Sequence, residues 1–231
     1  MTSPAIVGST GLVGSHILTT LLSLPSINTV SSLSRRDPAS VSINAKLNLL
    51  VDADNSKWAE KLAAVSPPPS IFFSALGTTR GAAGSIEAQR AIDYDLNLSL
   101  AKTAKSSGVK VYVLISTSGA NAHSMMAYPK MKGELEDAIK ALEFDQTVIL
   151  RPGLIVGSRE ESRPAEWVIR KLAGAVGMIA NPLKDVWAQD KDVIARAAVN
   201  AGLKALDGEV PKVWEIGQSE IIKLGRTEWK S

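Results

Sequence analysis

Tyr128 and Lys132 are the two residues of this chain whose types and spacing best suit chemistry. Residues four apart share one face of a helix, so the lysine ammonium can approach the phenol. A nearby cation favours the phenolate and brings the pKa of tyrosine down from about 10 toward neutrality, where proton exchange is efficient. The hydroxyl of Thr117, at the end of an apolar run, can hold a carbonyl oxygen. The pattern predicts proton transfer to oxygen; the alternative is a structural tyrosine with a solvated lysine.

Pro129 bears on the alignment of this pair. A residue that precedes proline is biased away from helical dihedral angles. We therefore expect Tyr128 to lie at or before the N-cap of the helix that carries Lys132.

A glycine-rich turn at the start of the chain forms a second group of candidate residues. Glycines at positions 8, 11 and 14 follow a short apolar run and open an amphipathic stretch. Such a turn lets a pyrophosphate approach the backbone, while the helix N-terminus offers amide groups and partial positive charge. The alternative is a merely tight turn between strand and helix. The predicted dinucleotide-binding turn consists of Gly8, Ser9, Thr10, Gly11, Leu12, Val13 and Gly14.

Ser34, Arg35 and Arg36 follow the second apolar run, where NAD-specific folds commonly carry a carboxylate for the ribose diol. Guanidinium groups bind a 2′-phosphate in charge-assisted, bidentate pairs, whereas a carboxylate would repel it. The two arginines therefore predict NADPH or NADP as the cofactor, with NADH disfavoured. The alternative is an exposed basic loop that Asp37 partly neutralises.

Further contacts to the dinucleotide are expected at other strand ends. Asp52 can accept a hydrogen bond from the adenine amino group, or it is an ordinary strand-end residue. Small residues after the fourth run let the backbone lie against adenosine. Arg151 pairs structurally or belongs to the same edge. The remaining predicted contacts are Leu76, Gly77, Thr78, Thr79, Ser116, Pro152 and Gly153.

Short apolar runs alternate with longer amphipathic stretches, which indicates an α/β protein. Buried strands separated by helices require a parallel sheet covered on both faces, the doubly wound arrangement or Rossmann fold. We expect one domain over 1–231, in which a small C-terminal region from about Arg163 covers the substrate. Two helical faces are predicted over Leu12–Leu22 and Ile92–Ala104. The predicted strands are Ala5–Val7, Thr29–Leu33, Leu47–Val51, Ile71–Ala75, Lys110–Ser116, Thr147–Leu150 and Val213–Ile216.

Composition excludes several other classes of function. The 231 residues include no cysteine, which removes disulfides, thiolate nucleophiles and cysteine-ligated metals, and two histidines make a metal site improbable. Acidic and basic residues are interspersed along the chain, and the net charge of +3 does not predict nucleic acid binding. No apolar run approaches the ~20 residues of a membrane span. No cleavable presequence is visible at the N-terminus, so import by a standard signal is disfavoured.

Several of these segments together resemble the short-chain dehydrogenase/reductase superfamily, in its atypical branch. They are Gly8–Gly14, Ser116 with Thr117, Tyr128 with Lys132, and Arg151–Gly153. More specific segments resemble the group of the mammalian Tat-interacting oxidoreductase-like protein and its fungal relatives reported at the mitochondrial outer membrane. These segments are Leu76–Arg80, Tyr128–Glu136 and Glu161–Trp167.

The resemblance implies that Thr117 orients the substrate, Tyr128 is the acid/base, and Lys132 is its partner and binds the nicotinamide ribose. It also implies a location in the cytoplasm or peripherally on the mitochondrial outer membrane. Pro129 departs from the usual residue after the tyrosine.

Two functions follow from these patterns. The first is an NADPH-dependent reductase of a carbonyl or quinone-like small molecule, with Tyr128 as proton donor. The alternative is an NADPH-binding regulatory protein that presents a surface to a protein partner without significant turnover. An epimerase or dehydratase acting on nucleotide sugars is disfavoured, because the chain after Arg163 is short. The charge-dense segment Arg159–Trp167 is interpreted as a solvated loop.

Overall fold

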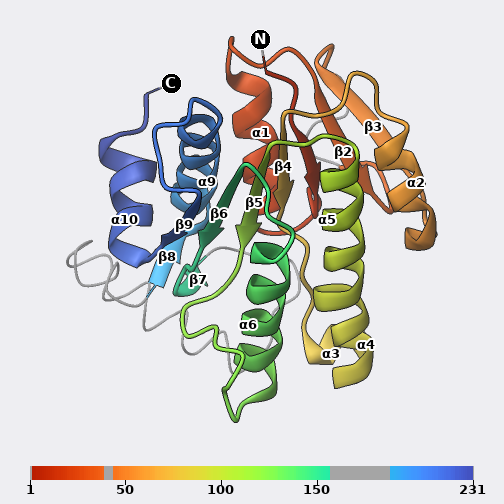
Figure 1. Ribbon diagram of the computed structural model, residues 1–231, viewed down its shortest axis with the longest axis vertical. Coiled ribbons are helices and arrows are strands. Elements are labelled where there is room, and N and C mark those ends of the chain that lie inside the picture. Colours follow the sequence, from red (N-terminus) through yellow and green to blue (C-terminus); the bar gives the residue numbers. More distant parts are fainter. Residues whose placement is uncertain (1, 39–43, 157–187, 231) are drawn as a thin grey trace.

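The structure, a computed structural model, describes residues 2–38, 44–156 and 188–230. Its centre is a seven-stranded sheet in the order β3-β2-β1-β4-β5-β6-β9, in which every neighbouring pair is parallel (Figure 1). All seven predicted strands are present, each within one residue of the expected bounds. They are β1 (Ala5–Val7), β2 (Val30–Ser34), β3 (Leu47–Val51), β4 (Ile71–Ser74), β5 (Val111–Ile115), β6 (Gln146–Leu150) and β9 (Val213–Ile216).

Helices cover both faces of this sheet, which confirms the doubly wound fold. On one face α1 (Gly14–Ser23) packs against α9 (Lys191–Leu206). On the other face lie α2 (Trp58–Ala63), α5 (Asn97–Ser106) and α6 (Ala127–Lys140) (Figure 1). The shorter helical segments are η1 (Asn55–Lys57), α3 (Arg80–Ala83), α4 (Ile86–Arg90), the π-helix η2 (Ala91–Leu96), α10 (Gln218–Ile222) and the π-helix η3 (Lys223–Thr227).

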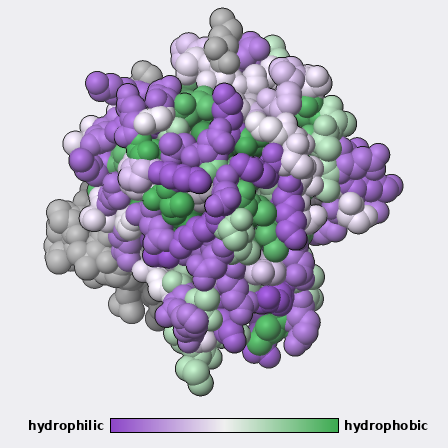
Figure 2. All heavy atoms as spheres, in the orientation of Figure 1, coloured by the Kyte–Doolittle hydropathy of each residue, from purple (hydrophilic) through white to green (hydrophobic). Residues whose placement is uncertain are grey.

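The inner strands are buried and the outer strands are not. β1, β2, β4 and β5 are buried along their whole length, because helices cover both of their faces. Edge strands β3 and β9 keep much of their surface partly exposed, so the expectation of uniformly buried strands is wrong at the edges. The outer surface seen in Figure 2 is largely hydrophilic, with apolar patches between the charged groups.

The π-helix η2 changes which residues of the long helical segment face the core. We expected Ile92 and Leu96 to share a buried face with Ala101 and Ala104. The two alanines are buried, but Ile92 and Leu96 are only half-buried, and the polar residues Asp93 and Asn97 are buried instead. A π turn holds more residues than an α turn, so it shifts the phase of the helix that follows.

Tyr128 lies inside helix α6, which corrects the expectation from Pro129. The helix begins at Ala127 with Met126 as its extended N-cap. Pro129 occupies the first turn, where a backbone N–H has no partner within the helix, so proline is tolerated there. Tyr128 and Lys132 therefore share one face of α6.

The C-terminal part of the chain builds the main layers from residue 188 onward. Strand β9 extends the sheet, and α9 packs on β5, β6 and α1. A second, two-stranded sheet joins β7 (Leu154–Val156) to β8 (Ala188–Asp190) in parallel, which the sequence did not predict. Of the region that we expected to cover the substrate, residues 163–187 lie outside the described residues.

Candidate functional site

The glycine turn lies where the strand order reverses, between the carboxyl ends of β1 and β4, the usual place of a ligand crevice in such sheets. Gly8 has φ +83°, and a Cβ on it would lie 2.5 Å from the carbonyl carbon of Ala75. A Cβ on Gly14 would lie 2.1 Å from the Gly8 oxygen. The fold itself therefore requires glycine at both positions.

Gly11 differs from its two neighbours in the turn. A Cβ on Gly11 would meet a single described atom within 4 Å, the Gly8 oxygen at 3.1 Å. This contact is tight, but it is milder than the overlaps at Gly8 and Gly14. Gly11 also keeps the backbone open to a ligand, so this cradle fits a pyrophosphate.

The other residues of the turn divide between fold and surface. Ser9 is buried, and its hydroxyl accepts a hydrogen bond from the Ser32 hydroxyl at 2.8 Å. Val13 is buried in the core with α1, Leu12 is half-buried, and Thr10 is exposed. The first turn of α1 carries no acidic side chain, so nothing there repels an anion.

Arg35 and Arg36 follow directly after β2 and are both exposed. Neither guanidinium forms an ion pair or hydrogen bond within the part of the chain that the structure describes. Two cations with free donor groups thus stand at the carboxyl end of β2, beside the glycine turn of the paired strand β1. This placement fits recognition of a phosphate.

Asp52 has local partners. Its carboxylate accepts from the Asp54 amide at 3.0 Å and forms an ion pair with Lys61 at 3.5 Å. These contacts favour the reading of Asp52 as an ordinary strand-end residue that organises the turn after β3.

The loop after β4 is held by three buried side chains that the sequence analysis missed. The Thr78 amide donates to Oδ1 of Asp93 at 2.6 Å, and Gln89 donates to the Thr78 carbonyl oxygen at 3.1 Å. Asn97 donates to the Leu76 carbonyl oxygen at 3.4 Å. Gly77 remains exposed and Thr79 caps α3. Gln89, Asp93 and Asn97 are spaced four residues apart, and this row of polar residues on one helical face was the signal that could have identified them.

The chemistry predicted for Tyr128 and Lys132 is only partly realised. Lys132 is buried at 3% exposure, and its Nζ donates to the Ile115 carbonyl oxygen at 3.2 Å. Tyr128 is 42% exposed. We expected the ammonium to favour the phenolate. Instead, desolvation and then the charge of Asp93 raise the pKa of Tyr128 to about 12. The phenol is therefore protonated at neutral pH.

The end of β5 is tied to α6 and β6 by a buried carboxylate. The Ser116 hydroxyl donates to Glu136, which is 1% exposed. The Arg151 guanidinium donates to the same carboxylate from Nε at 3.2 Å and from Nη2 at 2.5 Å. Arg151 also forms an ion pair with Glu215, with Nη1 at 2.8 Å from the carboxylate. Ser116 and Arg151 thus serve structural pairing. Thr117 is half-buried, and its hydroxyl donates to the Ser118 carbonyl oxygen at 3.4 Å.

Pro152 and Gly153 follow β6 at the same edge. The Pro152 carbonyl oxygen accepts from the Ser118 amide at 2.7 Å, which joins the loop after β6 to the loop after β5. Gly153 is half-buried. The segment Arg159–Trp167 lies outside the described residues.

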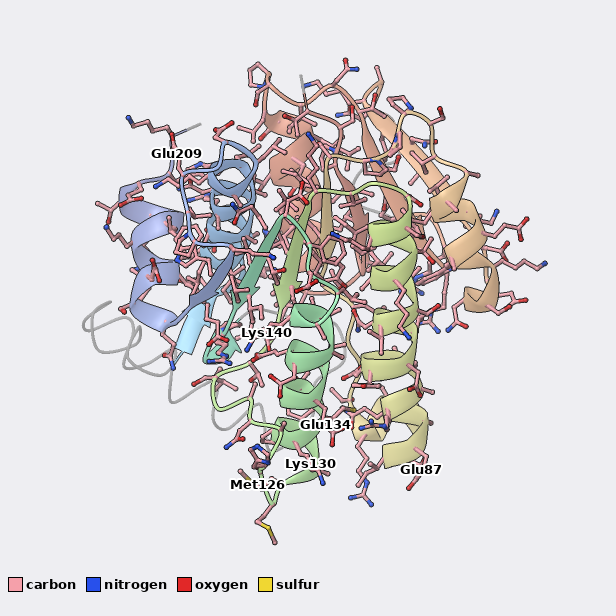
Figure 3. All side chains as sticks on the ribbon, in the orientation of Figure 1. Glu87, Met126, Lys130, Glu134, Lys140 and Glu209 are labelled. Carbon is pink, nitrogen blue, oxygen red and sulfur yellow. The ribbon has the colours of Figure 1, made fainter. Side chains whose placement is uncertain are left out.

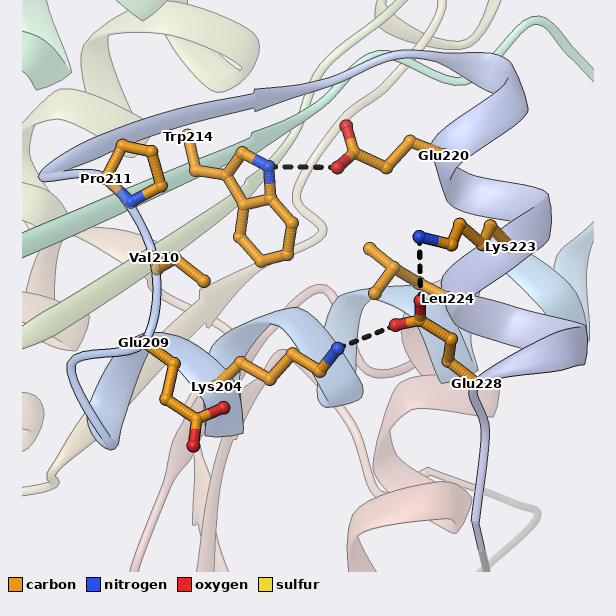
Figure 4. Close-up of a pocket in the computed structure, with 9 residues that line it drawn as sticks. All are labelled: Lys204, Glu209, Val210, Pro211, Trp214, Glu220, Lys223, Leu224 and Glu228. Atoms are coloured by element: carbon orange, nitrogen blue, oxygen red, sulfur yellow. Dashed lines mark hydrogen bonds and ion pairs between the residues drawn. The ribbon is translucent and has the colours of Figure 1, made fainter.

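A pocket elsewhere on the molecule lies between the start of β9 and the helices α10 and η3 (Figure 4). Trp214 donates to Glu220 at 3.2 Å, and Glu228 binds Lys204 at 2.6 Å and Lys223 at 2.9 Å. The pocket contains none of the predicted site residues. Its lining charges largely neutralise one another.

Within the described ranges, no group of histidine, aspartate and glutamate side chains could hold a metal ion. Among the helices of the same ranges, none is long and apolar enough to cross a membrane.

Solved structures with a similar fold include sugar-nucleotide enzymes. The Bordetella bronchiseptica enzyme WbmH, in complex with NAD+, is 16% identical, with a TM-score of 0.68 over 94% of this chain and 75% of that one. A UDP-glucose 4-epimerase from Thermotoga maritima, with UDP-glucose, is 15% identical, with a TM-score of 0.67 over 99% of this chain and 84% of that one. At such identity the likeness shows the fold alone.

Sequence comparison reaches much closer relatives. A protein of Emericella nidulans named "Protein fmp52, mitochondrial" is 57% identical over 98% of this chain and 100% of its own length. A protein of Neurospora crassa named "Protein fmp-52, mitochondrial" is 46% identical over 99% of this chain and 97% of its own length. The family model described as HIM1 matches residues 43–177. The chain therefore belongs to the HIM1 family and to the family of Fmp52 proteins.

Proposed function

We propose that the protein is an NADPH-dependent oxidoreductase of the short-chain dehydrogenase/reductase type, which reduces a carbonyl or quinone-like small molecule. The observation that carries the proposal is the common edge of the sheet: the glycine cradle follows the carboxyl end of β1, and Lys132 of α6 contacts the carboxyl end of β5, with only β4 between these two strands. The resemblance to the group of the Tat-interacting oxidoreductase-like protein is in keeping with this activity.

The residues present fit the cofactor. The turn from Gly8 to Gly14 would hold the pyrophosphate, the exposed arginines Arg35 and Arg36 the 2′-phosphate, and Lys132 the nicotinamide ribose. The strand-end loops around Gly77 and Gly153 would line its length. NADPH supplies a hydride when bound. The NAD+ bound by WbmH on the same fold supports a nicotinamide cofactor.

Tyr128 would donate the proton that balances the hydride. The phenol carries its proton in this structure, as a donor requires, but its pKa of about 12 lies above the range in which proton transfer near neutral pH is most efficient. Thr117 would hold the substrate oxygen. The neighbouring side chains of Met125 and Met126 are exposed at 101% and 67%, and Figure 3 shows Met126 projecting from the tip of α6. Flexible thioethers beside the proton donor favour an apolar substrate.

A second candidate is an NADPH-binding regulatory protein without significant turnover. It is favoured by a specific observation: Lys132 donates to a backbone carbonyl, and no hydrogen bond joins it to Tyr128 among the described residues. The names of the relatives place them in mitochondria, and we propose the same location here, peripheral on the outer membrane.

A titration with NADPH, followed by an oxidation screen over aldehydes, ketones and quinones, tests the proposal. The native protein should bind NADPH and turn over at least one substrate, while Tyr128→Phe should bind equally and lose about 100-fold or more in turnover. Binding without turnover that depends on Tyr128 supports the regulatory protein. A native chain that binds no dinucleotide overturns both functions.

Cofactor choice is tested separately with Arg35→Ala. The loss of a charge-assisted contact to the 2′-phosphate should weaken NADPH binding about tenfold and leave NADH binding unchanged. The measurement is the dissociation constant for each nucleotide by fluorescence. An equal NADPH constant in both proteins would mean that Arg35 does not read the phosphate.

A further inference from the structure

Lys132 is an ammonium group in a buried position. Its side chain is 3% exposed, and its one hydrogen bond within the described part of the chain goes to a neutral acceptor, the Ile115 carbonyl oxygen. A buried cation is strongly unfavourable unless a charge of opposite sign compensates it. Two carboxylates act on it electrostatically, Asp93 and Glu136.

The charge of Glu136 is already paired with that of Arg151. Glu136 lies one helical turn after Lys132. Its carboxylate accepts hydrogen bonds from Nε and Nη2 of Arg151 and from the Ser116 hydroxyl. Arg151 also pairs with Glu215, but Glu215 has Lys140 as a second cation at 2.5 Å, so the two carboxylates and the two cations of this cluster balance. Glu136 therefore leaves little attraction for a further cation.

Asp93 is the carboxylate without a cation of its own. It is 1% exposed, and its printed partners are the neutral donors Thr78 and Gln89, at 2.6 Å and 3.4 Å. No lysine or arginine nitrogen lies within 4 Å of it in the described structure. Burial raises the pKa of Asp93, and the charge of Lys132 opposes that rise. Each of the two buried charges thus lacks a matching charge unless the other supplies it.

We propose that Asp93 is the counter-charge of Lys132 and a positioning residue that acts through it. The π-helix η2 packs against α6 and brings the Asp93 carboxylate to the loop after β4, where it accepts from the Thr78 amide. Asp93 keeps the ammonium charged and in place, ready for the hydroxyl groups of a ligand. The charge pairing stands on the structure alone, whereas its consequence for nicotinamide binding rests on the proposed function.

A double-mutant cycle on folding tests the pairing. Asp93→Asn and Lys132→Met should each raise the equilibrium constant for urea unfolding, because each leaves one buried charge unmatched. The double variant should be at least tenfold more stable than the product of the two single effects predicts. The matched control is Asp95→Asn, an exposed neighbour on the same segment, whose combination with Lys132→Met should be multiplicative.

The cycle also decides whether Asp93 and Lys132 form a charge pair when a single variant fails to fold. If Asp93→Asn alone does not fold but the double variant does, the pairing is supported as strongly as by a measured coupling. If the double variant is no more stable than the product, or does not recover folding, Asp93 is not the counter-charge of Lys132.

The pH dependence of NADPH binding tests the role in the site. The charged groups that act on Lys132 are Asp93 on η2 and Glu136 on its own helix, and Glu136 is in turn paired with Arg151. Without Asp93, the ammonium should lose its proton at lower pH, so the alkaline loss of NADPH affinity should move about one pH unit toward acid in Asp93→Asn. Asp95→Asn should match the native profile.

An unshifted profile in Asp93→Asn would refute the role in binding even if the stability cycle shows coupling. A native protein that binds no NADPH would instead refute the proposed function and leave the stability cycle to decide the charge pair. The two failures are therefore distinguishable.

Discussion

Gly8, Gly11 and Gly14 have the same side chain but differ in what requires it. A Cβ on Gly8 would lie 2.5 Å from the backbone of Ala75, after β4, and one on Gly14 would lie 2.1 Å from the Gly8 oxygen, so these glycines serve the packing of the turn itself. At Gly11 the tightest contact would be 3.1 Å. That contact is tight without being a full overlap, and the approach of the proposed cofactor to the backbone would be a second reason for glycine there.

This difference predicts that one alanine substitution mainly lowers stability and that the other mainly weakens cofactor binding. Gly14→Ala should destabilise the fold by about 3 kcal/mol, because the overlap forces backbone to move. Gly11→Ala should unfold within a few degrees of the native Tm but weaken NADPH binding about tenfold or more. Thermal unfolding and a fluorescence titration measure the two effects. A Gly11→Ala protein with native affinity would show that no ligand approaches the turn there.

Helix α6 is the element that organises the site. Gly133 lets it approach the preceding loop closely, since a Cβ there would lie 2.2 Å from the Ala122 amide nitrogen. On the same helix Lys132 reaches the end of β5, and Glu136 binds both Ser116 and Arg151. Helix α6 therefore fixes Tyr128, the proposed proton donor, relative to the ends of two strands, β5 and β6.

The C-terminal elements are joined by a carboxylate whose charge depends on pH. Glu228 accepts hydrogen bonds from Lys204 on α9 and Lys223 on η3, and these lower its pKa from 4.5 to about 2. A lowered pKa in the folded state means that its contribution is complete above the ordinary pKa of glutamate and is lost as the pH falls toward about 2.

Glu228→Gln should therefore be less stable than the native protein near neutral pH, by a modest amount because the pair is partly exposed. The difference should shrink as the pH falls from about 4.5 to about 2. Urea unfolding across this range measures it. Glu209→Gln is the control, since Glu209 lines the same pocket without a side-chain ion pair among the described residues. A difference that stays constant with pH would contradict the assignment.

At the scale of the whole molecule, the last elements of the chain complete the sheet and its cover. β9 pairs with β6, and α9 buries apolar residues against α1, β5 and β6. These contacts join residues about 180 positions apart in the sequence, between α1 and α9. The described C-terminal residues therefore share a sheet and a core with the strand that precedes the glycine turn.

A fragment that ends at residue 190 should therefore fail to fold cooperatively. It would lack α9 and β9 and expose the apolar face of α1, including Ile17 and Leu21. Near-ultraviolet circular dichroism and urea unfolding of the fragment measure this. A cooperative transition in the fragment would mean that the C-terminal elements are a dispensable addition.

Much of this architecture could be predicted from the sequence because its signals are local. Apolar runs of strand length, a glycine turn directly after the first of them, and the four-residue spacing of Tyr128 and Lys132 depend on near neighbours. The order of the strands was not predicted, because the general rules of parallel sheets allow more than one order. The predicted strand positions match the structure in every strand of the main sheet.

Tertiary structure alone decided the electrostatics of the site. A π turn at Ala91–Leu96 moved Asp93 and Asn97 into the interior, although the helical pattern favoured Ile92 and Leu96. Partial desolvation and the charge of Asp93 raise the pKa of Tyr128, whereas its spacing to Lys132 predicted a fall. The sequence determined which side chains stand near one another along a helix. A pKa depends on solvent exclusion and on charges from distant segments, which only the folded chain brings together.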